Sequence, residues 1–288
     1  MKGQVEIDEN LVRALLCEQH PDLSGLALDR QADGWDNVLW RLGDDLLVRL
    51  PRRAEAAMLV HHEQRWLPEL APRLPLPVPV PVRTGVPGCG FPWSWSVVPW
   101  LAGEPGTVAP VNGAVVARQL GEFLCALHVE APASAPNNTY RSVPLAARAP
   151  DLEARLTSVA WRRVWEDALA ADPHSGPRLW VHGDLHPANV VVAGGALAGV
   201  IDFGDVCAGD PAVDLAAMWM LLPPSAHDRF AAAYGPIDEH LRRRARGWAV
   251  VFGTLLVAIG SDPRPASGRP LYLAVGRRTL ARLTRAAS

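Results

Sequence analysis

The sequence predicts an α+β fold with a small β-rich N-terminal lobe and a larger, mainly helical C-terminal lobe. Short runs of alternating or aliphatic residues, separated by turn signals, fill residues 38–101. After residue 102 the apolar residues instead recur at helical spacing. The segment AGEPG marks the boundary, so we place the lobes at residues 1–102 and 103–288 and expect a ligand cleft between them.

Composition narrows the class of protein. Of the 288 residues, 49% are hydrophobic and 20% are charged, which is typical of a soluble globular protein. A formal net charge of −2 gives no field that would steer the chain toward nucleic acid or lipid. The strongly apolar stretch at residues 247–260 is shorter than the roughly 20 residues that span a bilayer. No signal peptide is visible and the four cysteines are scattered, so we expect a cytoplasmic protein, a monomer or weak dimer, with no membrane or nucleic-acid partner.

The N-terminal lobe is predicted to contain a hairpin followed by a helix. VLWRLG (38–43) and LLVRLPRR (46–53) flank a GDD turn and predict two paired strands. Apolar residues at helical spacing predict a helix over 54–70. The stretch 74–82 alternates proline with aliphatic residues, and because proline removes backbone donors we expect an extended edge segment there. A further strand is expected within 91–101.

The C-terminal lobe is predicted to be helical around one small hairpin. Valines 190–192, the turn AGGA and LAGVIDF (197–203) predict two antiparallel strands. Helical spacing predicts five further helices, at 114–129, 151–171, 212–234, 238–260 and 270–286.

Polar residues gather at the open end of that hairpin, within and beyond the stretch VHGDLHPANVVV (181–192). Asn189 lies just before the first strand and Asp202 at the end of the second, so the antiparallel pairing brings them together. An amide oxygen and a carboxylate suit a hard cation such as Mg²⁺. Asp184, five residues before Asn189, is close enough to accept a proton from a hydroxyl nucleophile at the same place.

These residues carry a family resemblance. HGDLHPAN followed by VIDFG, with Asn189 and Asp202 13 positions apart, resembles the catalytic core of the aminoglycoside phosphotransferase family, small-molecule relatives of the eukaryotic protein kinases. RLPRR, EQRWLP and WSVVPWLAGE resemble that family's N-terminal lobe, so the likeness covers most of the chain. It implies a bilobal protein-kinase-like fold. It also implies transfer of the γ-phosphate of ATP or GTP, with Mg²⁺, to a hydroxyl of an antibiotic or similar small molecule.

The resemblance assigns roles in the C-terminal lobe residue by residue. Asp184 would be the catalytic residue that orients, and deprotonates, the acceptor hydroxyl. Asn189 and Asp202 would hold Mg²⁺ on the nucleotide phosphates. Asp210 and Asp214 would be structural, capping and bracing the helix that starts near residue 212.

It also assigns a nucleotide site in the N-terminal lobe. Arg49 stands where kinases place the lysine that pairs with the phosphates, and Glu63 would be its ion-pair partner. Glu55 is too near in sequence to fold back onto Arg49. The connection from Val98 to Trp100 would be the hinge whose backbone meets the nucleotide base.

Two features depart from the family pattern. Lys2 is the single lysine of the chain, so arginine must supply the charge at position 49. Arginine keeps the charge and can bind two phosphate oxygens, although its planar fork differs from a point charge. The turn DGWDN (33–37) has one glycine instead of a glycine-rich motif, so the phosphate-covering loop is assigned by its position between strands.

Several polar residues have ordinary structural interpretations. His182 is interpreted as a buried histidine that bonds backbone, and His186 as a scaffold of the loop with substrate contact as the alternative. His128 is expected in the core, and His61 and His62 on the surface of their helix. The arginine run at 242–246 is expected to spread around a surface helix instead of binding nucleic acid.

Other functions stay open on the sequence alone. A metal-dependent hydrolase would use His182, Asp184, His186 and Asp202 as ligands, although it leaves Arg49 without a role. A pseudokinase-like binding protein is the third hypothesis. The acceptor is open as well, because residues 103–288 contain 17 acidic and 18 basic residues, and this near balance does not require a cationic aminoglycoside. A macrolide phosphotransferase-like kinase, or one that acts on an amino sugar or a primary metabolite, fits equally.

Overall fold

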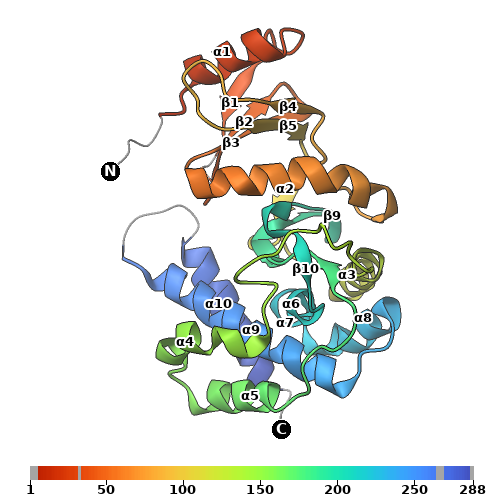
Figure 1. Ribbon diagram of the computed structural model, residues 1–288. Helices are drawn as coiled ribbons and strands as arrows, with labels where there is room; N and C mark the ends of the chain where they lie inside the picture. The colour runs from red at the N-terminus through yellow and green to blue at the C-terminus, as the bar shows by residue number, and fades with distance from the viewer. Residues whose placement is uncertain (1–5, 32–33, 264–268, 286–288) are drawn as a thin grey trace. The chain divides into compact units, whose positions relative to one another are not determined.

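The computed structural model describes residues 6–31, 34–263 and 269–285 (Figure 1). Its internal contacts divide the chain into two compact units. The first unit consists of Met1–Pro72, Pro77–Leu101 and Asp202–Gly204; the second consists of Arg73–Leu76, Ala102–Ile201 and Asp205–Ser288. An antiparallel sheet dominates the first unit and helices dominate the second, which confirms the predicted α+β class.

The first unit is built on a five-stranded antiparallel sheet in the order β1-β2-β3-β5-β4. The predicted hairpin is present, with residues Asn37 to Leu42 paired to residues Leu46 to Pro51. The strand expected within 91–101 is shorter than its window, because Pro92 and the turn before it precede the paired residues. The strands are β1 (Leu28–Arg30), β2 (Asn37–Leu42), β3 (Leu46–Pro51), β4 (Arg83–Gly85) and β5 (Trp95–Pro99).

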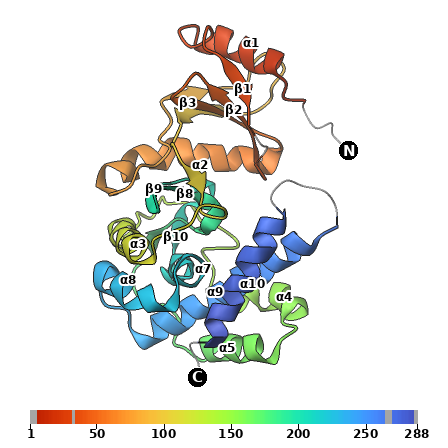
Figure 2. The same cartoon turned by 180° about the vertical axis from the view of Figure 1, so that it is seen from behind.

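Two helices flank this sheet, one on each side (Figures 1 and 2). Helix α1 (Glu9–Gln19) is capped by Asp8, whose carboxylate accepts the Leu11 N–H at 2.8 Å. Its apolar face packs into a core shared with strands β2, β3 and β5. Helix α2 (Ala54–Leu70) matches the predicted helix over 54–70 and carries Glu63 on its buried face.

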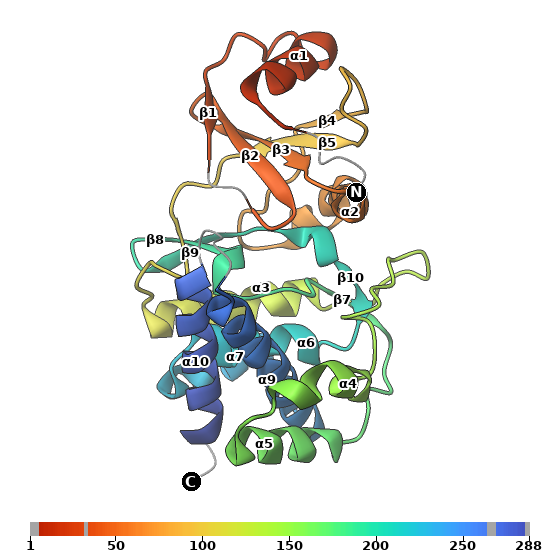
Figure 3. The same cartoon turned by 90° about the vertical axis from the view of Figure 1, so that its left-hand side faces the viewer.

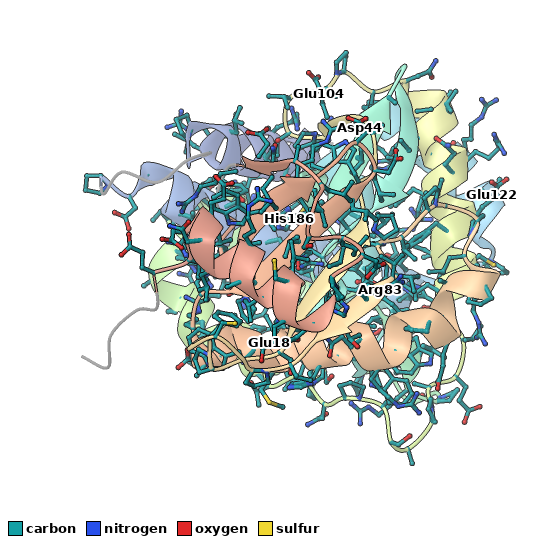
Figure 4. All side chains as sticks on the ribbon, turned by 90° about the horizontal axis from the view of Figure 1, so that it is seen from above. Glu18, Asp44, Arg83, Glu104, Glu122 and His186 are labelled. Carbon is teal, nitrogen blue, oxygen red and sulfur yellow. The ribbon has the colours of Figure 1, made fainter. Side chains whose placement is uncertain are left out.

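The second unit is mainly helical, as predicted. The long helices α9 (Glu239–Ser261) and α10 (Arg269–Arg285) lie along each other (Figure 2), with α4 (Ala149–Leu152) and α5 (Val159–Leu169) beside them. Helix α3 (Gly113–Leu127) packs against α8 (His227–Tyr234). Glu122 extends outward from α3 (Figure 4) and pairs with Arg118 one turn earlier. No helix in the described part of the chain is both long enough and apolar enough to cross a bilayer; the apolar part of α9 is core.

Two predicted helices are broken in the structure. The helix expected over 212–234 is three shorter ones, α6 (Ala212–Leu215), α7 (Ala217–Leu221) and α8. Pro223 and Pro224 account for the break between α7 and α8, because proline does not continue a helix. The helix expected over 151–171 is divided between α4 and α5, because the backbone is extended at Ser158.

The second unit contains a small hairpin. In the sequence it comes between two short strands that pair with each other. Strands β8 (Val190–Ala193) and β9 (Ala196–Val200) are joined at Gly194 and Gly195, which have φ of 56° and 80° and permit the tight turn. Strand β6 (Glu104–Pro105) pairs with β8. Strands β7 (Leu179–Val181) and β10 (Cys207–Gly209) run side by side (Figure 3). The segment from 182 to 206 therefore leaves and returns at one place.

Candidate active site

The first unit contains a buried ion pair between β3 and α2. Arg49 lies in the middle of the sheet, paired with Leu39 on β2 and Ser96 on β5, and is 7% exposed. Its Nη1 donates to Glu63 Oε1 at 2.8 Å. This contact confirms the predicted pairing with Glu63, whereas Glu55 is exposed.

Asp202 joins this pair from a distant part of the sequence. Arg49 Nη2 lies 3.3 Å from Asp202 Oδ1, and the Phe203 N–H donates to Glu63 Oε1 at 2.9 Å. Burial by itself disfavours a charged guanidinium, but Glu63 and Asp202 outweigh burial and raise the pKa of Arg49. The result is one cation shared by two carboxylates, of which Asp202 is the more exposed, with 43% of its side chain accessible.

The segment Asp202–Gly204 is fixed on helix α2. Gly204 lies so close to α2 that a Cβ there would stand 2.8 Å from the Leu59 Cβ. His62 bonds the Gly204 carbonyl oxygen at 3.1 Å through Nδ1, so His62 is partly buried and the expectation of a surface residue was wrong. Asp202 has a φ of 65°, a left-handed conformation that aspartate adopts more readily than most residues.

The predicted hinge residues continue the pairing of β5. Val98 is buried and pairs with Leu47 of β3, and the Trp100 N–H donates to the Asp45 carbonyl oxygen at 2.7 Å. The Arg41 guanidinium lies over the Trp100 ring at 4.7 Å. The Trp100 N–H is therefore engaged within the first unit.

In the second unit, the loop after β7 is held by Asp214. Its two carboxylate oxygens accept the N–H groups of His182 and Gly183 at 2.7 and 2.9 Å. Asp214 is fully buried and also contacts His128 Nε2 at 3.2 Å, which places His128 in the core as predicted. Asp214 therefore fixes the loop, whereas Asp210 accepts the N–H of Ala212, the first residue of α6, at 3.0 Å.

His182 is a structural residue of this loop. Its Nδ1 lies 3.2 Å from the Asp184 backbone nitrogen, and its Nε2 lies 2.9 Å from the Ile201 carbonyl oxygen. Both ring nitrogens therefore face the backbone, which removes a ligand that a metal-dependent hydrolase needs. No group of three or more His, Cys, Asp or Glu side chains in the described ranges is arranged to hold a metal ion.

Asp184 receives donors on both carboxylate oxygens. Oδ1 accepts from Arg141 Nη2 at 2.9 Å, and Oδ2 lies 3.2 Å from Asn189 Nδ2 and 3.3 Å from His186 Nε2. Burial opposes ionisation of this carboxyl, but His186 and Arg141 outweigh it and hold the pKa of Asp184 well below its ordinary value. Asp184 is thus an ionised carboxylate with 24% of its side chain accessible.

The amide of Asn189 is oriented by the same loop. Its Nδ2 also donates to the Asp184 carbonyl oxygen at 2.9 Å, which leaves Oδ1 as the oxygen that Asn189 offers to a cation. The Ile201 N–H donates to the Asn189 carbonyl oxygen at 3.0 Å, so pairing of the hairpin extends one step beyond Val190 and Val200. Asp202 is the next residue in the chain.

Arg141 was not found by sequence reasoning. It lies in an irregular proline- and asparagine-rich segment, 43 positions before Asp184, with no motif of its own. The arginine run at 242–246, in contrast, is structural: Arg243 and Arg246 pair with Asp167, and Arg244 pairs with Asp210.

Two comparisons of the sequence with known proteins give matches. The family model described as "Phosphotransferase enzyme family" (APH) matches residues 29–248. A curated homoserine kinase from Methylocella silvestris is 35% identical over 97 residues, which are 32% of this chain; the match spans 30% of the length of that relative.

Two solved structures show the same fold. The GDP complex of wild-type aminoglycoside 2'-phosphotransferase-IIIa has a TM-score of 0.71 at 18% identity, covering 98% of this chain and all of the other. The macrolide 2'-phosphotransferase from Brachybacterium faecium, solved without ligand, has a TM-score of 0.64 at 26% identity, covering 95% of this chain and 98% of the other.

Proposed function

We propose that this chain, which belongs to the phosphotransferase enzyme family, transfers the γ-phosphate of ATP or GTP to a hydroxyl of a small molecule. The observation that carries the proposal is the buried Arg49–Glu63 pair with Asp202 in contact. A charged group within a sheet is costly unless it has a use, and a hydrolase centred on the loop 182–189 gives Arg49 none.

The nucleotide is assigned to residues of the first unit. Arg49 is the cation for the phosphate oxygens, and Glu63 holds its guanidinium in place. The backbone of Val98 and Trp100 is assigned to the base. The solved relative that binds GDP and the family match support a nucleoside triphosphate as donor.

Asn189 and Asp202 are the proposed Mg²⁺ ligands. They fit this ion because Mg²⁺ prefers oxygen ligands, and Asn189 Oδ1 and the accessible carboxylate of Asp202 supply them. When bound, Mg²⁺ would offset the negative charge of the transferred phosphate. Asn189 is held for this role by its two donations to Asp184.

Asp184 is the proposed catalytic residue. Phosphoryl transfer passes through a loose transition state, so alignment of the attacking oxygen matters more than removal of its proton early in the reaction. An ionised carboxylate with a lowered pKa is suited to accept the hydrogen bond of a hydroxyl and hold that oxygen in line.

The acceptor is proposed to be an antibiotic or similar hydroxylated small molecule. The relatives described above are named for aminoglycosides, macrolides and homoserine, all of which carry a hydroxyl. We place the reaction in the cytoplasm, with the chain a monomer or weak dimer, since its four cysteines are unpaired thiols and its net charge is small.

A nucleotide-consumption screen tests this function. Purified protein with Mg²⁺ and either ATP or GTP is assayed against aminoglycosides, macrolides, amino sugars and homoserine. We expect consumption that depends on one acceptor class and that disappears without Mg²⁺. Nucleotide binding without turnover on any hydroxylated acceptor would favour a pseudokinase-like protein, and tightly bound zinc with no nucleotide binding would favour a hydrolase.

A further inference from the structure

A loop that is held by side-chain hydrogen bonds places Arg141 next to Asp184. The side chain of Asn138 accepts the N–H groups of Tyr140 and Arg141 at 2.8 and 3.0 Å through Oδ1. Its Nδ2 donates to Asp205 Oδ1 at 2.6 Å, which ties the loop to the segment after the hairpin. Only 14% of the Arg141 side chain is accessible, so its guanidinium has a fixed place.

Helices α9 and α10 border the same place. The Arg141 guanidinium lies over the Phe252 ring of α9 at 4.7 Å. The ring of His186 meets that of Tyr272 of α10 edge-on, with centroids 6.2 Å apart. The sequence of α9 from 247 to 261 contains no acidic residue, and neither does α10. A positive charge on an acceptor would therefore find no carboxylate on these two helices.

The contacts of Asp184 leave one lone-pair position of its carboxylate for an acceptor hydroxyl. A carboxylate offers about four lone-pair positions. Asn189 and His186 occupy the two positions of Oδ2, whereas Arg141 occupies one position of Oδ1. The position that is left lies on Oδ1, next to the guanidinium. An acceptor hydroxyl bound there has the permanent charge of Arg141 as its neighbour.

We propose that Arg141 is a specificity-determining residue, an inference that rests on the proposed function. It selects acceptors that carry an oxygen substituent, instead of a protonated amine, on the carbon adjacent to the one that bears the reacting hydroxyl. A guanidinium donates hydrogen bonds and accepts none, so it attracts a neighbouring hydroxyl, ether, carbonyl or carboxylate oxygen and repels an ammonium group. Asp205, a further carboxylate near Asp184, is engaged in a hydrogen bond from the Asn138 amide.

Matched acceptor pairs test the inference. Glycerol and 2-amino-1,3-propanediol differ only in a hydroxyl or amine beside the primary hydroxyls, and glucose and glucosamine form a second such pair. With Mg²⁺ and the active nucleotide, the wild-type kcat/KM is expected to favour the oxygen member by roughly ten- to a hundredfold, the size of a repulsion between charges that are partly screened.

Variants of Arg141 separate selection from a merely structural role. Arg141→Ala is expected to bring the ratio of each pair toward one, whereas Arg141→Lys keeps the positive charge and the preference. Arg118→Ala, on the surface of α3, is the matched control and should leave every ratio unchanged.

The remaining outcomes count against the inference. A wild-type preference for the amines, or an equal loss on all four acceptors in Arg141→Ala, overturns it. Failure of the wild type to phosphorylate any of the four while it binds the Mg²⁺-nucleotide, measured by calorimetry, overturns the acceptor class alone. Failure to bind nucleotide at all removes the proposed function, and this inference with it.

Discussion

Arg49 shows how a departure from the family pattern is accommodated by local chemistry. Its two terminal nitrogens contact two different carboxylates, Glu63 at 2.8 Å and Asp202 at 3.3 Å. A planar fork can divide its donors in this way, whereas a lysine ammonium is a point charge. The arginine thus keeps the positive charge at this position and also holds Asp202.

The stability of this pair gives a prediction for one residue. Arg49→Ala leaves Glu63 buried without its cation, so we expect the free energy of unfolding to fall by about 3–5 kcal/mol in a urea titration. The double variant Arg49→Met, Glu63→Leu removes both charges and should recover most of this loss. Its affinity for nucleotide should nevertheless stay low, because no cation then faces the phosphates. Recovery of wild-type affinity in the double variant would contradict the role of Arg49.

Pairs on regular elements could be predicted from the sequence, whereas contacts from irregular loops could not. The pairing of Arg49 with Glu63 was predicted because the family resemblance assigns it, and both residues lie on elements, β3 and α2, whose periodicity is clear. Arg141 reaches Asp184 from an irregular loop, where no periodicity fixes the direction of a side chain. The same limit applies to His62, whose partner Gly204 is 142 positions away.

At the scale of elements, the important unit is the loop after β7 together with its anchor. Asp214 binds the backbone of His182 and Gly183, directly before Asp184. Gly183 has a φ of 83°, and a Cβ there would lie 2.7 Å from the Asp205 carbonyl oxygen. The loop is therefore fixed by a buried acid on one side and by close backbone packing on the other.

Removal of the anchor should affect stability and catalysis together. In Asp214→Ala the two buried N–H groups lose their acceptor, at a cost of about 1–3 kcal/mol for each group. We expect a lower midpoint in urea, and a lower kcat because Asp184 loses its fixed position. Asp228→Ala, on the exposed face of α8, is the matched control. Unchanged stability and kcat in Asp214→Ala would refute the anchoring role.

Sequence patterns predicted the long elements well and the short ones poorly. The helices α2, α9 and α10 and both hairpins match their expected positions closely, because each repeats its own period several times. Strands β6, β7 and β10 have two or three residues each, too few to show a period, and pair with distant segments. The break before α8 follows from Pro223 and Pro224, which interrupt an otherwise helical spacing.

At the scale of the molecule, the order of elements along the chain predicts the fold class. The five-stranded sheet lies before residue 102 and most of the helices after it, and the two compact units follow that division with two exceptions, the short segments Arg73–Leu76 and Asp202–Gly204. Asp202–Gly204 belong to the first unit although their neighbours in sequence belong to the second. Such an exchange depends on the contacts of Glu63 with Phe203 and of Leu59 with Gly204, which only coordinates can show.

The central claim is that Asp184 acts in phosphate transfer while Asp202 acts in binding the Mg²⁺-nucleotide. The most direct test measures both properties in the same samples of wild type, Asp184→Ala and Asp202→Ala, by calorimetry and by single-turnover transfer from γ-labelled nucleotide. We predict that Asp184→Ala binds the Mg²⁺-nucleotide as the wild type does but transfers no phosphate, and that Asp202→Ala loses binding. Transfer at the wild-type rate by Asp184→Ala would contradict the account.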